Sequence, residues 1–203
     1  MRGASFYIGY LMESKKKLRK SLKNLRKKES KCDKKRYEVN IFKKIIKLPC
    51  YTRSKFLAIY IANENEISTS KIFTDAILRR KKIFVPKINN KKEMVFVSIN
   101  KKTKLTSNLY GIMEPISGKI IDPRRLDLVI TPLLGFDKTG TRLGMGGGYY
   151  DKYFHFLRLR YKWFKPKLLG VGLEKQQIYL AKKDAWDINL FKIVTETNVY
   201  NFK

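Results

Sequence analysis

Apolar side chains recur every three or four residues twice near the start of the chain, first at Leu18, Leu22 and Leu25 and then at Tyr37, Ile41 and Ile45. This spacing predicts two amphipathic helices whose other faces carry lysine. Ser14 is a suitable N-cap for the first helix, and Pro49 in "LPC" ends the second, which covers about residues 33–47.

Mainly apolar runs follow the helices and are predicted to be strands, and the first of them is continuously apolar, as is typical of a buried parallel strand. The runs are "FLAIYI" (56–61), "KIFVP" (82–86), "LDLVITPLL" (126–134), "LLGVGL" (168–173) and "FKIVT" (191–195). A helix that Ser68, Thr69 or Ser70 can cap separates the first two runs, which indicates a βαβ unit. "MVFVSI" (94–99) is a further strand that could run antiparallel.

The remaining segments complete the prediction of an α/β fold. Residues 100–125 show little periodicity and are expected to form a long surface loop, whereas a helix is predicted from Tyr149 through Leu157. We predict one three-layer α/β/α domain with a mainly parallel sheet over residues 12–203. Because Met12 opens a second start-like stretch, "MESKKKLRK", residues 1–11 are expected to be a disordered extension.

The charge of the chain is strongly positive but evenly spread. There are 46 Lys and Arg against 17 Asp and Glu, a formal charge of +29. A nucleic-acid-binding surface usually has a basic stripe with interleaved aromatics, which is absent from the sequence, so we expect no nucleic acid partner. No apolar run approaches the roughly 18 residues of a membrane span, so no membrane partner is expected either. Cys32 and Cys50 form no metal or disulfide pattern, which favours the reducing cytoplasm.

Unusual residues follow several predicted strands. Glu64 and Glu66 come after the first strand, Pro86 and Lys87 after the second, and "RLGMGGGYYD" (142–151) after the run at 126–134. Because ligands gather beyond the carboxyl ends of parallel strands, we expect these residues to meet at one rim. The glycine run either makes a tight turn or exposes backbone amides that hold phosphate, with Arg142 as a phosphate partner and Asp151 as a Mg²⁺ ligand.

The segment "TPLLGFDKTGTRLGMGGGYYDKYF" (131–154) resembles the signature of the 5-formyltetrahydrofolate cyclo-ligase family, also called 5,10-methenyltetrahydrofolate synthetases. Other blocks resemble family blocks in the same order: "KKKLRK", "NENEISTSKI", "VPKI", "GIMEP" and "WDINLFKIVTE". The resemblance covers about residues 12–197. It implies an ATP- and Mg²⁺-dependent ring closure in which the formyl oxygen on N5 of 5-formyltetrahydrofolate is phosphorylated and N10 then attacks the formyl carbon. ADP and phosphate are released, and polyglutamate tails on the folate would use part of the positive field.

The resemblance also implies roles for individual residues. Arg142 and Asp151 would be catalytic, with Asp151 the metal ligand. The ATP phosphates would be held by Lys15, Arg19, Arg142, Gly144, Gly146, Gly147, Gly148, Tyr149 and Tyr150. The folate would contact Ile61, Glu66, Tyr110 and Tyr149, with Glu66 accepting N–H donors of the pterin. An Asp151→Asn substitution is then expected to remove turnover and leave folding intact.

Each assignment has a plain structural alternative. Lys15 and Arg19 could be solvated charges, Asp151 a first-turn helix carboxylate, and Ile61 and Tyr110 core residues. The chain also departs from the family pattern. Met145 and Gly147 stand where some members carry aromatic or basic residues, which leaves the work of the loop to backbone amides. Trp186 stands where many members have histidine, and Leu190 and Phe191 where some have a second acidic metal ligand.

Two other functions remain open from the sequence. One is a basic nucleic-acid-binding protein on a decayed enzyme fold, and the other is an ATP-dependent kinase or ligase for a different small substrate. The intact "RLGMGGGYYD" favours the folate enzyme over the first, since a lysine-driven binder does not need Asp151 or the glycines.

Overall fold

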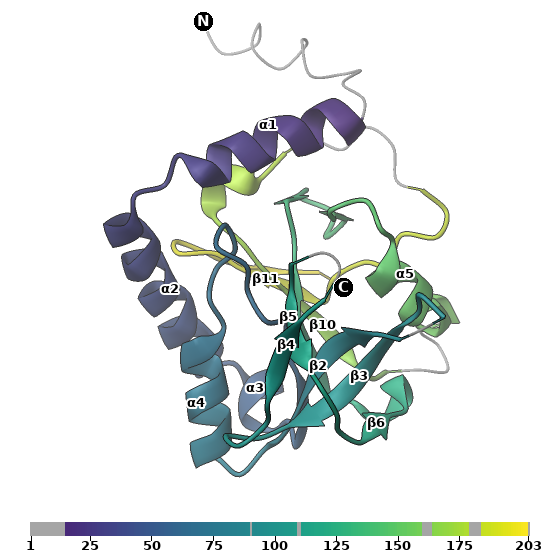
Figure 1. Cartoon of the computed structure of the whole chain (residues 1–203). Coiled ribbons are helices and arrows are strands. Elements are labelled where there is room, and N and C mark those ends of the chain that lie inside the picture. The colour runs from purple at the N-terminus through teal and green to yellow at the C-terminus, as the bar shows by residue number, and fades with distance from the viewer. Residues whose placement is uncertain (1–14, 90, 109–110, 160–163, 179–183, 203) are drawn as a thin grey trace, which may run out of the picture.

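The computed structural model describes residues 15–89, 91–108, 111–159, 164–178 and 184–202 (Figure 1). The extension expected at residues 1–11 and the predicted folate contact Tyr110 lie outside these residues.

A sheet of eight strands forms the centre of the molecule, in the order β12-β11-β10-β7-β1-β2-β3-β6. The strands from β11 to β2 in this order run parallel, whereas β12, β3 and β6 pair antiparallel at the edges. The bounds are β1 (Phe56–Ala58), β2 (Lys82–Ile88), β3 (Met94–Ile99), β6 (Ile120–Ile121), β7 (Leu128–Pro132), β10 (Lys167–Val171), β11 (Lys192–Val194) and β12 (Val199–Asn201).

Helices cover both faces of this sheet, as Figure 1 shows for α2 and α4 on one side and α5 on the other. Leu57 and Leu128 pack into the core beneath α2, α3 and α4, whereas their neighbours Ala58 and Val129 pack into the core beneath α5 and η3. This alternation follows from the pleat of a strand and confirms the predicted α/β class. The bounds are α2 (Lys31–Ile45), α3 (Pro49–Thr52), α4 (Ser70–Leu78), α5 (Tyr149–Tyr153) and η3 (His155–Leu159).

The first helix, α1 (Lys15–Lys27), does not cover the sheet. Leu18 and Leu22 instead pack on Leu134 and Leu143. Leu134 directly precedes, and Leu143 belongs to, the small hairpin of β8 (Gly135–Phe136) and β9 (Arg142–Leu143). The helix therefore lies against the segment that leads into the glycine loop.

A buried lysine closes the short helix α3. Lys81 donates from Nζ to the carbonyl oxygens of Tyr51 at 2.7 Å and Ser54 at 2.5 Å, at the end of α3 where carbonyls lack partners within the helix. Burial lowers the pKa of Lys81, and the repulsion of Arg79 adds to this. The ammonium group thus satisfies buried acceptors that the helix leaves open.

The structure corrects two predictions about strands. The strand predicted at 56–61 ends at Ala58, because the Tyr60 hydroxyl donates to Ile67 and the Tyr60 carbonyl accepts from Thr69, so the chain turns into a loop. The strand β12 was not predicted, since only three residues, Val199–Asn201, pair with β11 and two of them are only partly buried.

Segments predicted as loop or helix also differ. Residues 100–125 contain the β4 (Leu105–Ser107) and β5 (Met113–Pro115) hairpin, β6 and the 3₁₀ turn η2 (Pro123–Arg125). The hairpin is polar and exposed on β4, so it carries no strong apolar pattern. The helix predicted from Tyr149 changes to 3₁₀ geometry after Tyr153, and a last 3₁₀ turn, η4 (Glu174–Gln176), follows β10.

Candidate functional site

A pocket of about 610 Å³ opens at the carboxyl ends of β1, β2 and β7. This volume lies within the range of small-molecule sites. Its walls come from the loop after β1, the end of β2, the β4–β5 hairpin and the glycine loop. The lining residues are Lys23, Tyr60, Ile61, Asn63, Glu66, Pro86, Ile88, Met94, Asn108, Gly111, Ile112, Met113, Glu114, Pro132, Leu133, Arg142, Gly144, Met145, Gly147, Gly148, Tyr149, Tyr150 and Asp151.

The predicted convergence at one rim is confirmed for most of its parts. Glu66, Pro86 and the glycine loop line the same pocket. Glu64 is exposed and does not line it, and Lys87 turns away to bind the carbonyls of Pro115 and Ile116 at 2.8 Å each. Of the two acidic residues after β1, Glu66 is the one in the pocket.

The glycine loop reaches the pocket through Gly144, Gly147 and Gly148, with Gly146 set back beside Arg19. Gly146 has φ +113° and Gly148 φ +65°, a region that residues with a Cβ rarely adopt. A Cβ on Gly147 would lie 2.9 Å from the Tyr149 ring, so the missing side chain also lets that ring lie over the loop. Because α5 is a helix of only five residues, its dipole adds little at this point, and the glycine backbone is what the loop contributes to the pocket wall.

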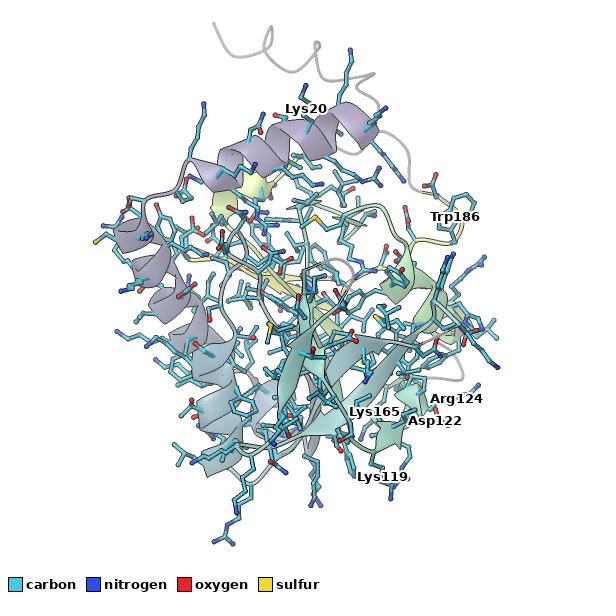
Figure 2. The ribbon with its side chains drawn as sticks, viewed as in Figure 1. Lys20, Lys119, Asp122, Arg124, Lys165 and Trp186 are labelled. Atoms are coloured by element: carbon cyan, nitrogen blue, oxygen red, sulfur yellow. The ribbon has the colours of Figure 1, made fainter. Side chains whose placement is uncertain are left out.

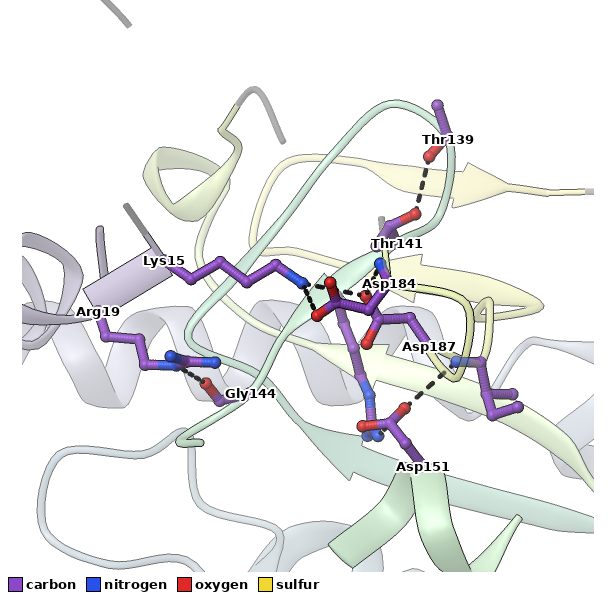
Figure 3. A network of polar contacts seen from close by, with 10 residues as sticks. Lys15, Arg19, Thr139, Thr141, Gly144, Asp151, Asp184 and Asp187 are labelled. Atoms are coloured by element: carbon purple, nitrogen blue, oxygen red, sulfur yellow. Dashed lines mark hydrogen bonds and ion pairs between the residues drawn. The ribbon is translucent and has the colours of Figure 1, made fainter. Parts of the chain in front are cut away.

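The buried Arg142 and the partly buried Asp151 form an ion pair at the base of the loop. Asp151 is labelled in Figure 3. Arg142 Nη2 donates to Asp151 Oδ1 at 2.9 Å, and the two side chains are 5% and 18% exposed. The guanidinium also lies 5.0 Å from the centre of the Tyr150 ring. Arg142 Nε is buried and has no hydrogen-bond partner among the described residues, so one donor of the guanidinium is unsatisfied.

Asp151 is thus tied to two groups of the protein. Besides Arg142, the backbone N–H of Ile188 donates to Asp151 Oδ1 at 3.3 Å. Oδ1 carries both bonds, and a carboxylate has a second hard oxygen of the kind that Mg²⁺ prefers. The described residues hold no group of three His, Cys, Asp or Glu suited to a metal. The residue therefore fits a Mg²⁺ ion that takes its other ligands from phosphate and water.

Lys15 and Arg19 on α1 both face the loop side of the molecule but do not line the pocket (Figure 3). Arg19 Nε donates to the Gly144 carbonyl at 3.0 Å and so holds the start of the loop. Lys15 Nζ lies 2.5 Å from Asp184 and 3.3 Å from Asp187. Partial burial would lower the pKa of Lys15, but the two carboxylates outweigh it and raise the pKa.

Glu66 is held in a largely buried position. Its Oε2 accepts from the backbone N–H of Asn63 at 3.0 Å, and its Oε1 lies 3.9 Å from Nη2 of the buried Arg26. Burial raises the pKa of Glu66, although the Asn63 N–H and the charges of Arg26 and Lys34 oppose the shift. A carboxyl group in this setting can accept N–H donors from a ligand in the pocket.

Aromatic and aliphatic side chains complete the walls. Ile61, Tyr149 and Tyr150, which were predicted to contact ligands, line the pocket, whereas Tyr110 falls outside the described residues. The Tyr150 hydroxyl is buried and has no hydrogen-bond partner among the described residues, and burial raises its pKa. This hydroxyl is a second polar group of the site whose hydrogen bonding is not satisfied by the described residues.

Several residues of the site were not predicted from the sequence. Glu114, in "GIMEP", is buried in the pocket wall and accepts from the Ile88 N–H at 3.3 Å and Asn108 Nδ2 at 3.1 Å. Asp184 and Asp187 join the site through Lys15, and the spacing "DAWD" offered a weak signal for a turn with two carboxylates.

Comparisons with known proteins agree with this geometry. Residues 11–196 match the model of the 5-formyltetrahydrofolate cyclo-ligase family. The chain is 30% identical over 194 residues to a probable 5-formyltetrahydrofolate cyclo-ligase of Caenorhabditis elegans, covering 92% of this chain and 94% of the relative. It is also 30% identical over 148 residues to the 5-formyltetrahydrofolate cyclo-ligase of Haemophilus influenzae, covering 70% and 76%.

A solved structure resembles the fold over nearly its whole length. The NMR structure of 5,10-methenyltetrahydrofolate synthetase from Aquifex aeolicus superimposes with a TM-score of 0.79 at 30% identity, covering 93% of each chain. The family match includes the glycine loop, the Arg142–Asp151 pair and Glu66. The chain therefore belongs to the 5-formyltetrahydrofolate cyclo-ligase family.

Proposed function

We propose that the protein closes the ring of 5-formyltetrahydrofolate to give 5,10-methenyltetrahydrofolate, with ATP as the phosphoryl donor and Mg²⁺ as the metal. The observation that carries the proposal is the single pocket at which the glycine loop, the Arg142–Asp151 pair and Glu66 meet, in a chain that matches the family along nearly its whole length.

The first step is transfer of the γ-phosphoryl group from ATP to the formyl oxygen, with release of ADP. The amides of Gly144, Gly147 and Gly148 would hold phosphate oxygens, and the free Nε of Arg142 would neutralise charge on the group in transfer. Mg²⁺, when held by Asp151, would neutralise the charge of the ATP phosphates. Arg19 would act from behind the loop, by fixing the Gly144 carbonyl.

The second step is attack of N10 on the activated formyl carbon. The N10–carbon bond forms, N10 loses its proton and the carbon–oxygen bond breaks, with the oxygen leaving as part of inorganic phosphate. Glu66 would hold the pterin through its N–H donors, and Ile61 and Tyr149 would pack on the ring system, so that N10 and the formyl carbon stay close. No protein nucleophile is needed, because phosphorylation itself makes the oxygen a good leaving group.

The direct test is the near-ultraviolet absorbance of methenyltetrahydrofolate formed from 5-formyltetrahydrofolate with Mg²⁺ and ATP. Product should require all three components and disappear with EDTA. Glu66→Gln should raise the KM for the folate, whereas the neighbouring Glu64→Gln, which lies outside the pocket, should not. ATP turnover that is indifferent to 5-formyltetrahydrofolate would point instead to another substrate and contradict the proposal.

The setting of the reaction follows the same reasoning. Cys32 and Cys50 form no disulfide, which suits the cytoplasm that we propose as the compartment. None of the helices in the described residues combines the length and apolar character of a membrane span.

A further inference from the structure

A second, smaller pocket of about 230 Å³ lies between α1 and the loop after β1. It is lined by four cationic residues of α1, three asparagines and Met145 of the glycine loop. The cations are Lys20, Lys23, Arg26 and Lys27. None of its lining residues is acidic, so the pocket has a concentrated positive field. Lys20 on α1 is labelled in Figure 2.

One of these cations is buried without a full set of partners. The side chain of Arg26 is 5% exposed, and its Nε donates to the Asn65 carbonyl. Its Nη2 has no hydrogen-bond partner among the described residues, because the nearest carboxylate oxygen, Glu66 Oε1, is 3.9 Å away. A buried charged donor in this state is costly unless a ligand completes it.

The small pocket adjoins the main one, since Lys23, Asn63 and Met145 line both pockets. The volume is below the range of sites for drug-sized molecules but sufficient for a small oxyanion. A tetrahedral oxyanion would accept donors from lysine, arginine and asparagine side chains together.

We propose that this pocket binds the inorganic phosphate that the reaction releases, as a station on its way out of the main pocket. The inference rests on the proposed function, which supplies one phosphate per turnover. The carboxylates of a folate tail fit this pocket less well. Glu66, the proposed partner of the pterin, lies beside Arg26, and the glutamate tail is at the end of the folate opposite to the pterin. The phosphates of ATP are not the expected occupant either, because the proposed function assigns them to the backbone amides of the glycine loop in the main pocket.

The test is titration of the protein with inorganic phosphate, by calorimetry or ³¹P NMR, in the presence of saturating ADP. Lys20→Gln/Lys27→Gln removes two cations that line only the small pocket. Lys16→Gln/Lys28→Gln is the matched control, because it removes the same charge from exposed positions of the same region outside the pocket. Arg26 is left unchanged, since its loss would free Glu66.

We expect phosphate to bind the wild-type protein. The affinity of the pocket variant for phosphate should be about tenfold lower or weaker still, whereas that of the control variant should stay within about twofold of wild type. The initial rate of cyclisation should stay near that of wild type in the pocket variant, while inhibition by added phosphate weakens by the same factor as binding.

Three results would overturn the inference. Equal weakening of phosphate binding in both double variants would mean that phosphate responds only to the overall positive charge of the region. Loss of phosphate binding when ADP is present would mean that phosphate binds in the nucleotide site, and displacement of phosphate by a γ-linked glutamate oligomer without a pterin would mean that the pocket binds the folate tail. The titration needs no turnover. A wild-type protein that binds phosphate in this pocket but forms no methenyl product would therefore count against the proposed reaction and not against the site.

Discussion

The Arg142–Asp151 pair predicts that Asp151→Asn destabilises the protein as well as stopping the reaction. Arg142 is 5% exposed, and Asp151 is the carboxylate 2.9 Å from its Nη2. Replacing the carboxylate by an amide keeps the shape and one acceptor oxygen but removes the negative charge that balances a buried guanidinium. The structure therefore revises the expectation, drawn from the sequence, that this substitution leaves folding intact.

The magnitude follows from the burial of Arg142, whose charge would be left unbalanced, and from the partial burial of Asp151. Removing one member of a buried ion pair costs about 3–5 kcal/mol, and a retained hydrogen bond to a charged group offsets part of this. We expect a loss of about 2–3 kcal/mol in the free energy of unfolding, or about 5–10 °C in Tm for a chain of this size.

The assay is urea and thermal unfolding followed by circular dichroism. Asp122→Asn is the control, because Asp122 and Arg124 form an ion pair at the edge of the molecule with side chains 47% and 50% exposed (Figure 2). It should be within about 0.5 kcal/mol of wild type. Arg142→Met in the Asp151→Asn background should recover part of the stability, since it removes the unbalanced charge. The reasoning is refuted if Asp151→Asn has the same free energy of unfolding as the Asp122→Asn control and if Arg142→Met restores no stability, because Asp151 then does not balance a buried charge.

Three further predictions follow. Gly146→Ala should weaken ATP binding and lower the free energy of unfolding by about 1 kcal/mol, because φ is +113° at this position. Gly144→Ala is the control and should fold like wild type, since Gly144 has open space around it and an ordinary φ. Calorimetry with ADP and urea unfolding compare the two variants. Because burial raises the pKa of Glu66 above 4.5, its carboxylate takes up a proton as the pH falls through that raised value, and the KM for the folate should rise at this pH. Glu66→Gln should abolish this pH dependence. A wild-type KM that does not change on the acid side would contradict the prediction. Lys81→Met should lower the free energy of unfolding by about 2–3 kcal/mol by leaving the carbonyls of Tyr51 and Ser54 unsatisfied, and an unchanged urea midpoint would show that water replaces the ammonium group.

The sheet could be predicted from the sequence because its strands are buried on both faces. The stretches 128–130 and 168–173 are apolar throughout, and a parallel strand between two helical layers requires this composition. The β4–β5 hairpin and β12 could not be predicted in the same way. Each of β4 and β12 pairs with a strand close to it in the sequence, but the side chains of β4 are exposed and those of β12 are at most partly buried, so neither strand carries an apolar pattern.

The site was predictable where one loop carries several of its groups. "RLGMGGGYYD" contains the ion pair, the glycines and two tyrosines, so local spacing was enough to bring them together. The partners of Lys15 were not predictable, because Asp184 and Asp187 reach it only through the arrangement of α1 beside a turn near the other end of the chain. The choice between Glu64 and Glu66 likewise depends on the turn after β1, in which Asn63 binds Glu66.

The ion pair between Lys15 and Asp187 joins positions separated by 172 residues, and this separation bears on synthesis. A ribosome adds about 5–20 residues per second, so α1 emerges about 10–30 s before the turn that binds it. During this interval Leu18 and Leu22 have no β8–β9 hairpin to cover them until residue 143 has been made. A chain released before residue 184 would therefore lack β11 and β12 and leave Lys15 without its carboxylate partners, although Leu18 and Leu22 could already pack on the β8–β9 hairpin.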